Sequence, residues 1–159
     1  MNTKSPEGSP AVRALRPSDR NEWLRMLFGL YPGTEESDHM PLIDAFLDGR
    51  ATGELSPSAV FVLERPAGGL GGFLELAVRN YAEGCSGETP YVESWFVDED
   101  LRGGGHGRGL LEAAEQWARE HGYAELASDA LLDNHRSQAA HLALGFEEVE
   151  RSVHFRKSL

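Results

Sequence analysis

The chain has 159 residues, a length typical of one domain, and its 40% hydrophobic content fits a globular protein with a real core. A formal net charge of −11, from 26 acidic and 15 basic side chains, argues against a nucleic-acid partner and favours a cationic one. Apolar runs too short for a membrane span, the lack of a secretory pattern and a single cysteine, Cys85, lead us to expect a cytoplasmic protein without membrane contacts, internal disulfides or a structural zinc site.

The N-terminus predicts a tail followed by one domain. Residues 1–10 are polar and rich in Pro, Ser and Gly, which is typical of a disordered tail. Residues 11–159 show no linker and no internal repeat, so we expect a single domain. Its first element is a short strand at residues 12–15.

A helix is predicted next, because Asp19 can serve as its N-cap with Glu22 three residues on. Trp23 and Leu27 belong to an apolar face that recurs at helical spacing. The Tyr-Pro-Gly sequence at 31–33 ends this helix.

Three further elements follow a flexible acidic segment at residues 33–38. A second helical pattern spans about residues 38–48. Residues 58–65 and 70–79 are rich in strand-forming side chains and are joined by a short Pro-Ala-Gly-Gly connection, so they should pair antiparallel.

The middle of the chain predicts a β–α–β unit. After a polar loop at residues 80–90, a strand at 91–97 leads into a glycine turn and then a helix that Gly122 ends. A strand at 124–128 follows, and it must lie parallel to the first because a helix connects them.

The C-terminal part predicts one more helix, at residues 134–144 and ended by Gly145, and a closing hairpin formed by 146–150 and 152–156. The order of elements is then β, α, α, β, β, β, α, β, α, β, β. This order indicates an α/β fold, with a central mixed sheet and helices on both of its faces.

The glycine turn is the strongest local signal for binding. Its glycines are Gly103, Gly104, Gly105, Gly107 and Gly109. Without side chains in the way, backbone N–H groups can converge on a phosphate at the N-terminus of the following helix, and Arg102 and Arg108 bracket the turn. Neither the nucleoside-triphosphate loop nor the dinucleotide fingerprint fits this spacing, and a flexible loop without a ligand is the alternative.

Two patterns carry a family resemblance. The pattern Arg102-x-x-Gly105-x-Gly107 after an apolar strand resembles the acetyl-CoA pyrophosphate loop of the GCN5-related N-acetyltransferase superfamily. Within that superfamily, the combination of LASDA at 126–130 with LDN at 132–134 looks like the aminoglycoside 6′-N-acetyltransferases. Ser137, His141 and LGF at 144–146 extend this similarity, which covers most of the chain beyond residue 10.

The resemblance implies an enzyme that transfers acetyl from acetyl-CoA to the 6′-amino group of an aminoglycoside antibiotic, by direct attack in a ternary complex, and so confers resistance. Acetyl-CoA is then the co-substrate, no metal is expected, and the partner is a cationic small-molecule amine. The alternatives are an acetyltransferase for another amine, such as a polyamine or a protein N-terminus, and a non-catalytic acyl-CoA-binding module. The oligomeric state is left open, with a homodimer as one candidate.

We expect carboxylate side chains to bind the substrate amine. A lysine-type amine has a pKa near ~10.4, so the site must hold a cation and then receive its proton before the amine can attack. The resemblance assigns Asp129, at a predicted strand end, to the amine contact and to the role of base. Glu93 is a second substrate contact and catalytic candidate, and Glu75 is a further carboxylate in the middle of a strand. The alternatives are a helix cap for Asp129 and a salt bridge with Arg79 for Glu93. Tyr91, Glu93 and Trp95 share a face unless a bulge intervenes.

Three further substrate contacts are implied by the resemblance: Tyr31, Tyr81 and Glu150. For each of them, core packing or an ordinary exposed side chain is the alternative.

The cofactor residues implied by the same resemblance are Trp95, Phe96, Val97, Gly103, Gly104, Gly105, His106, Gly107, Arg108 and Asn134. The backbone of the strand would hold the pantetheine arm and the glycine turn the pyrophosphate, with N-capping as the alternative for Asn134. His141 occupies the position at which many superfamily members have a tyrosine that protonates the leaving thiolate, and a packing histidine is the alternative.

Overall fold

The computed structural model describes residues 8–51, 53 and 56–159. Of the tail predicted for residues 1–10, residues 1–7 lie outside the described residues. The elements in chain order are β1 (Ala11–Ala14), the 3-10 turn η1 (Pro17–Asp19), α1 (Arg20–Leu30), α2 (Glu36–Leu47), β2 (Ala59–Glu64), β3 (Leu70–Arg79), β4 (Thr89–Val97), η2 (Glu99–Leu101), α3 (His106–Glu120), β5 (Ala127–Ser128) and α4 (His135–Ala143).

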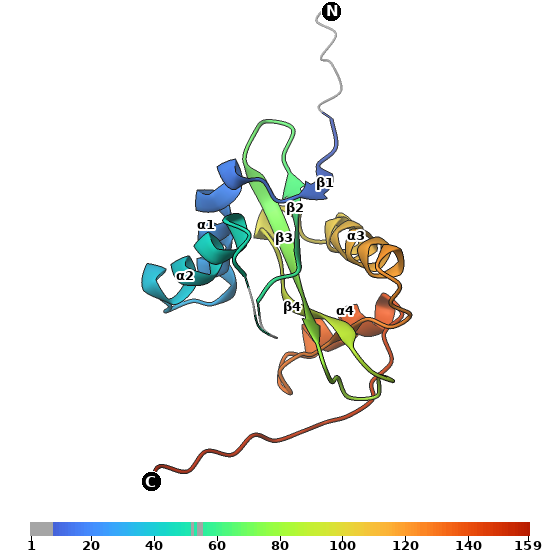
Figure 1. Ribbon diagram of the computed structural model, residues 1–159. Helices are drawn as coiled ribbons and strands as arrows, with labels where there is room; N and C mark the ends of the chain where they lie inside the picture. Colours follow the sequence, from blue (N-terminus) through green and yellow to red (C-terminus); the bar gives the residue numbers. More distant parts are fainter. Residues whose placement is uncertain (1–7, 52, 54–55) are drawn as a thin grey trace, which may run out of the picture.

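One mixed sheet forms the centre of the molecule, with its strands in the order β1-β2-β3-β4-β5. The first four strands pair antiparallel, and β5 pairs parallel to β4. Helices α1 and α2 cover one face, whereas α3 and α4 lie on the other (Figure 1). The predicted mixed sheet with helices on both faces, and the parallel pairing across α3, are confirmed.

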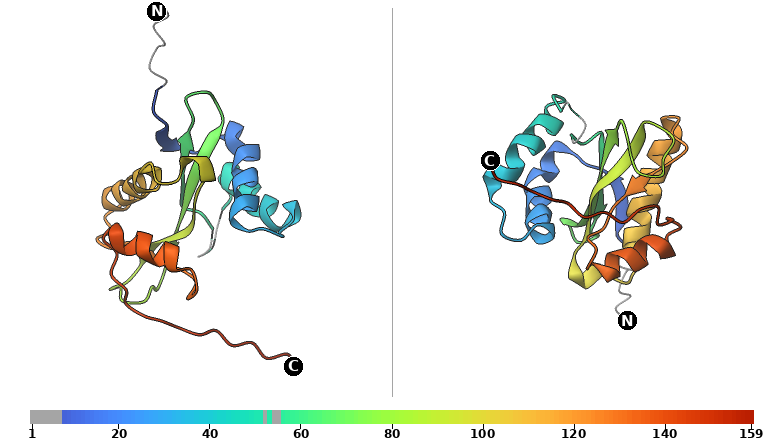
Figure 2. Two further views of the ribbon diagram at one scale, coloured as in Figure 1. Left: turned by 180° about the vertical axis from the view of Figure 1, so that it is seen from behind. Right: turned by 90° about the horizontal axis from the view of Figure 1, so that it is seen from below.

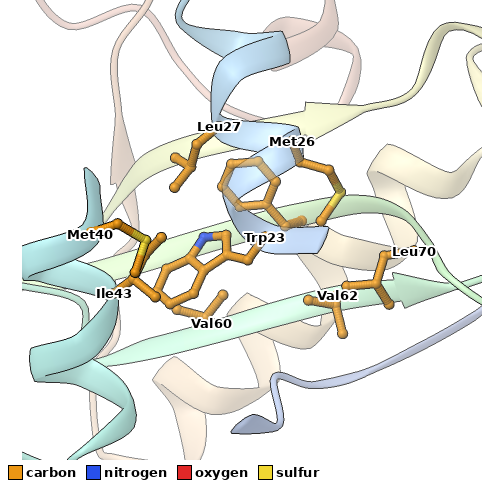
Figure 3. Close-up of a cluster of buried hydrophobic side chains, with 9 residues drawn as sticks. Trp23, Met26, Leu27, Met40, Ile43, Val60, Val62 and Leu70 are labelled. Carbon is orange, nitrogen blue, oxygen red and sulfur yellow. The ribbon is translucent and has the colours of Figure 1, made fainter. Parts of the chain in front are cut away.

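Two apolar clusters hold these layers together. On the α1 side, Trp23 and Ile43 are fully buried and pack over Val60 on the sheet, and Figure 3 shows the Trp23 ring lying between α2 and β2. On the other face, Leu110 on α3 packs against Leu76 on β3. Burying one such side chain stabilises the fold by roughly 1.5–3 kcal/mol, so the apolar faces of these helices determine where they dock.

A β-bulge in β4 interrupts the alternation of its side chains. Glu75 pairs with Ser94, but the next residue of β3, Leu76, pairs with Val92, so Glu93 is the extra residue. Val92 packs with the α3-side cluster, whereas Ser94, two positions on, contacts Tyr31 at the end of α1. The bulge therefore turns the polar residues of β4 toward α1, and Trp95 packs on the opposite face.

The start of α1 differs from the prediction. No hydrogen bond from the Asp19 side chain caps the helix, which begins at Arg20. Instead, its carboxylate accepts hydrogen bonds from the Arg13 guanidinium at 2.7 and 3.0 Å and from the Arg16 backbone N–H at 2.8 Å. The local spacing predicted Asp19 as a helix cap, but its carboxylate binds Arg13 of β1 instead. This ion pair connects the edge strand to the turn that precedes α1.

The predicted closing hairpin is wrong. Residues 145–159 have no assigned helix or strand, and the end of the chain leaves the body as an extended tail (Figures 1 and 2). The apolar alternation in this segment is compatible with a strand, but a strand needs a neighbour, and β5 is only two residues long instead of the predicted five. The exposed apolar side chains of this tail, from residue 147 on, are Val149, Val153, Phe155 and Leu159.

Candidate active site

The candidate site lies where β4 and β5 separate. β5 pairs with β4 at only two positions, Tyr91 with Ala127 and Val92 with Ser128. Beyond Val92, β4 continues for five residues with no paired strand on this side among the described residues. This opening leaves backbone groups of β4 available to a ligand, and it lies between the carboxylates and the glycine turn.

Asp129 follows β5 directly and is exposed. Its carboxylate shares a hydrogen bond with the Tyr91 hydroxyl, and burial of that phenol together with the nearby negative charge raises the pKa of Tyr91. The helix-cap alternative is not supported for α4, because the Asn134 side chain caps that helix by accepting the Ser137 N–H at 3.1 Å. Asp129 is therefore available at the strand end, as predicted.

Glu93 forms a salt bridge with Arg79, the alternative role considered from the sequence. Both of its oxygens accept hydrogen bonds from Arg79, each at 2.7 Å, and the guanidinium lies 3.6 Å above the Tyr91 ring. The Glu93 side chain is 19% exposed. A cation that binds Glu93 must therefore compete with Arg79.

Glu75 lies behind this surface rather than on it. Only 4% of the residue is exposed, and the Trp23 indole N–H donates to Oε1 at 2.8 Å. Burial raises the pKa of Glu75 to about 7, although hydrogen bonds from Ser94 and Trp23 favour the charged form. The carboxylate thus lies beneath the surface, opposite Ser94.

Tyr31 stands among these acidic groups at the end of α1. Its hydroxyl lies 3.0 Å from Ser94 Oγ, and its ring stacks on His39 of α2 at 6.1 Å between centroids. Burial of the hydroxyl and the surrounding charges of Glu75, Glu93 and Asp129 raise the pKa of Tyr31. The structure therefore brings four of the predicted substrate residues together: Tyr31, Glu75, Glu93 and Asp129.

The other two predicted substrate residues lie on exposed segments outside the sheet and helices. Tyr81 is 67% exposed in the loop after β3, and Glu150 belongs to the exposed tail. The loop and the tail do touch, because a Cβ added at Gly84 would lie 2.7 Å from Val149. In the part of the chain that the structure describes, neither Tyr81 nor Glu150 forms a hydrogen bond or ion pair with Glu75, Glu93 or Asp129.

The glycine turn leaves the N-terminus of α3 uncovered by side chains at two of its positions. Gly103 and Gly105 adopt positive φ values of +79° and +80°, and Gly105 is the N-cap of α3. A Cβ at either position would point into open space, so the turn leaves room beside the helix N-terminus. The first N–H groups of α3 have no partners within the helix, and their positive end of the dipole favours an anion.

The acidic stretch before the turn faces away from it. Asp98 accepts hydrogen bonds from Arg25 at 3.0 Å and from Arg65 at 3.0 Å, and Arg65 also binds both oxygens of Asp100 at 2.8 Å. Burial disfavours the charged form of Asp98, but these arginines lower its pKa. Sequence reasoning missed both arginines, because they lie 73 and 33 residues from Asp98 and no local pattern links them.

His141 is half-buried and held by hydrogen bonds at both ring nitrogens and by aromatic contacts. Nε2 lies 2.7 Å from Ser128 Oγ, and Nδ1 lies 2.7 Å from the Ser137 carbonyl oxygen. The ring also meets Trp95 edge-on, with centroids 5.5 Å apart. Both nitrogens are engaged, which is the arrangement expected of the packing alternative.

Two negative findings apply to the part of the chain that the structure describes. No helix in it is long and apolar enough to cross a membrane. In the same residues, no cluster of three or more His, Cys, Asp or Glu side chains could hold a metal ion.

Comparisons with known proteins place the sequence and the fold in one family. The model of the family described as "Acetyltransferase (GNAT) family" matches residues 20–146. An "Aminoglycoside N(6')-acetyltransferase type 1" of Klebsiella aerogenes is 42% identical over 154 residues, covering 96% of this chain and 99% of the relative. A protein of the same name from Stenotrophomonas maltophilia is 35% identical over 95% of both chains. A solved structure of AAC(6')-Iy with the bisubstrate analog CoA-S-monomethyl-acetylneamine is 28% identical, covers 96% of this chain and 100% of its own, and superposes with a TM-score of 0.84.

Proposed function

This chain belongs to the acetyltransferase (GNAT) family, and from that premise we propose that it acetylates the 6′-amino group of aminoglycosides and thereby confers resistance to them. Relatives named for this reaction match almost the whole chain, at up to 42% identity. Acetyl-CoA supplies the acetyl group as a thioester. Residues 11–159 act as one acetyltransferase domain in this proposal.

The observation that carries the proposal is the group of carboxylates around Tyr31. Glu93 and Asp129 are the first residues beyond the last β4–β5 pair, and their charges act on Tyr31 together with that of Glu75. Negative charges in a partly dry cleft attract a polycation more strongly than the same charges on an open surface. In our assignment, Asp129 and Glu93 hold the ammonium group, and the Tyr31 ring packs on the sugar. Tyr81 and Glu150 are outer contacts.

The cofactor assignment rests on the glycine turn and the unpaired side of β4. Backbone groups of Trp95, Phe96 and Val97 hold the pantetheine arm in place of a further strand. The turn from Gly103 through Gly104, Gly105, His106 and Gly107 to Arg108 holds the pyrophosphate, and Asn134 contacts the arm from the start of α4. His141 packs α4 against β4, because both of its nitrogens already have partners.

A thiol-release assay tests this function against its alternatives. The purified protein with acetyl-CoA is offered an aminoglycoside panel, spermidine and a short peptide with a free N-terminus. We expect turnover of aminoglycosides with a kcat/KM at least tenfold above the other amines. Preference for spermidine or the peptide would reassign the substrate, and thiol release with none of them would leave only acyl-CoA binding.

We also propose a homodimer in which the C-terminal tail contacts the second copy. The tail exposes Val149 at 60%, Val153 at 69% and Phe155 at 93%. Apolar side chains presented in this way on an extended segment favour a partner. Light scattering after size exclusion should give twice the chain mass for the full chain and the chain mass for a variant that ends at Glu148. A full-length monomer at micromolar concentration would contradict the dimer.

A cytoplasmic location is part of the same proposal, because acetyl-CoA is a metabolite of the cell interior. Cell fractionation of a bacterial host should recover the acetylating activity with the cytoplasmic fraction. The same host should grow at higher aminoglycoside concentrations than one that expresses an inactive variant. Activity confined to the membrane or periplasmic fraction would refute this placement.

A further inference from the structure

Glu75 is a buried carboxylate in the middle of the central sheet that the substrate assignment leaves without a direct task. It is 4% exposed and lies opposite Val60 on β2 and Ser94 on β4. Trp23, which belongs to the apolar cluster of Figure 3, donates its indole N–H to Oε1 at 2.8 Å. Burying a carboxylate among apolar side chains is costly unless it serves a purpose, so this position requires an explanation.

A line of hydrogen bonds leads from this carboxylate to the surface. Ser94 hydrogen-bonds to Glu75, and the Tyr31 hydroxyl lies 3.0 Å from Ser94 Oγ. When Ser94 directs its single hydroxyl hydrogen to the carboxylate, its oxygen is free to accept the hydrogen of Tyr31 at 3.0 Å, a closer acceptor than the Glu93 carbonyl at 3.4 Å. Tyr31 is 39% exposed, so its own oxygen remains able to accept a proton from the cleft. With the Tyr31 hydrogen on Ser94, the two hydroxyl donors point inward, toward Glu75.

We propose that Tyr31, Ser94 and Glu75 form a proton relay for acetyl transfer, in which Glu75 receives the proton that the substrate ammonium must lose. This proposal rests on the function proposed above. In the relay, the Tyr31 oxygen takes a proton from the ammonium while the Tyr31 hydroxyl proton passes to Ser94 and the Ser94 proton passes to Glu75. Tyr31 touches the substrate, and Ser94 and Glu75 act through it.

The remaining chemistry balances with one proton on Glu75. The neutral amine nitrogen forms its bond to the acetyl carbon, and the carbon–sulfur bond breaks. The second proton of that nitrogen goes to the departing sulfur, which leaves as the thiol. The proton stored on Glu75 then returns to solvent along the same relay, so one proton is released for each amide formed.

The surroundings explain why Glu75, rather than its neighbours, ends the relay. Glu93 is held by two guanidinium nitrogens of Arg79, and protonating it would break that ion pair. Asp129 shares its hydrogen bond with Tyr91, and His39 of α2 is bonded to Thr34 at 2.7 Å. Burial raises the pKa of Glu75 to about 7, which suits a group that must accept and release protons near neutral pH. The pKa of Tyr31 is also raised, so its phenol stays neutral and passes the proton on.

The pH profile of kcat/KM tests the relay through Ser94→Ala and Tyr31→Phe, which keep the buried carboxylate. The wild type should lose activity below a midpoint near pH 7. Each variant should lose about 10²-fold at pH 7, the lower end of typical general-base effects, and recover part of it at pH 9, where more of the amine is already neutral. Thr89→Val removes another buried hydroxyl of β4, bonded to the Gly87 carbonyl, and should keep the wild-type profile. A loss equal at all pH values in both relay variants would overturn the proposal.

A second measurement uses the free enzyme and does not depend on turnover. The NMR shift of the Trp23 indole N–H should titrate near pH 7 in the wild type, because this group donates to the Glu75 carboxylate, and should be flat in Glu75→Gln. A Trp23 signal without a transition between pH 5 and 9 would refute the role of Glu75 as the proton acceptor. If instead the wild type acetylates no aminoglycoside while Trp23 titrates, the proposed function fails and the buried acceptor stands.

Discussion

Replacing Glu75 by glutamine removes an ionisable group from the sheet while keeping its size and its contact with Trp23. We expect the effect on stability to depend on pH. Because burial raises the folded-state pKa of Glu75 from its ordinary 4.5 to about 7, the folded protein holds a proton that the unfolded chain has already released between these values. As the pH rises from 4.5 to about 7, the free energy of unfolding of the wild type therefore falls relative to that of the variant.

The size of the effect follows from the two pKa values. The difference between 4.5 and about 7, at about 1.36 kcal/mol per pH unit, corresponds to about 3 kcal/mol. Urea denaturation of the wild type and of Glu75→Gln at intervals from pH 4 to pH 8 measures this change as a difference between the two proteins. Glu64→Gln, which alters a surface partner of Arg13, is a control without such a window. A stability difference between wild type and Glu75→Gln that stays constant from pH 4 to pH 8 would refute the reasoning.

Three other substitutions test separate parts of the site. Gly105→Val should weaken acetyl-CoA binding at least tenfold by calorimetry, whereas Gly122→Val, equally strained at φ +83° but at the far end of α3, should lower stability and leave that affinity unchanged. Glu93→Gln should raise the aminoglycoside KM more than the acetyl-CoA KM, and added salt should reduce this difference; equal shifts in both would make Glu93 purely structural. Arg65→Gln frees Asp100 beside the turn and leaves Asp98 with Arg25 alone, so it should raise the acetyl-CoA KM severalfold at constant aminoglycoside KM; an unchanged acetyl-CoA KM would show that Arg65 does not support the turn.

The helices, strands and glycine turn could be predicted because their signals are local. The apolar face of α1 with Trp23, the stop at Gly122 and the cap at Asn134 each depend on residues within one or two helical turns. The closing hairpin failed for the opposite reason. Its pattern of apolar residues was correct for a strand, but pairing depends on a neighbour that the same pattern does not specify.

The candidate site was predictable in its residue types and not in its arrangement. Asp129 follows from a strand end and Glu93 from its place within a strand, both with the family resemblance, but the bulge at Glu93 depends on the register between two strands. That register places Ser94 opposite Glu75 and in contact with Tyr31. Tyr31 and Ser94 are 63 residues apart, and no local sequence pattern predicts a contact over that separation. The buried carboxylate was visible as a mid-strand glutamate, whereas its route to the surface required the fold.

The regiochemistry of acetylation tests the central claim most directly. Neomycin and paromomycin differ only at the 6′ position, where the first carries an amine and the second a hydroxyl. With acetyl-CoA, we expect thiol release and a single acetyl group at the 6′ nitrogen of neomycin, and no turnover of paromomycin beyond the rate without antibiotic. Comparable turnover of paromomycin, or an acetyl group found on another nitrogen of neomycin, would contradict the account.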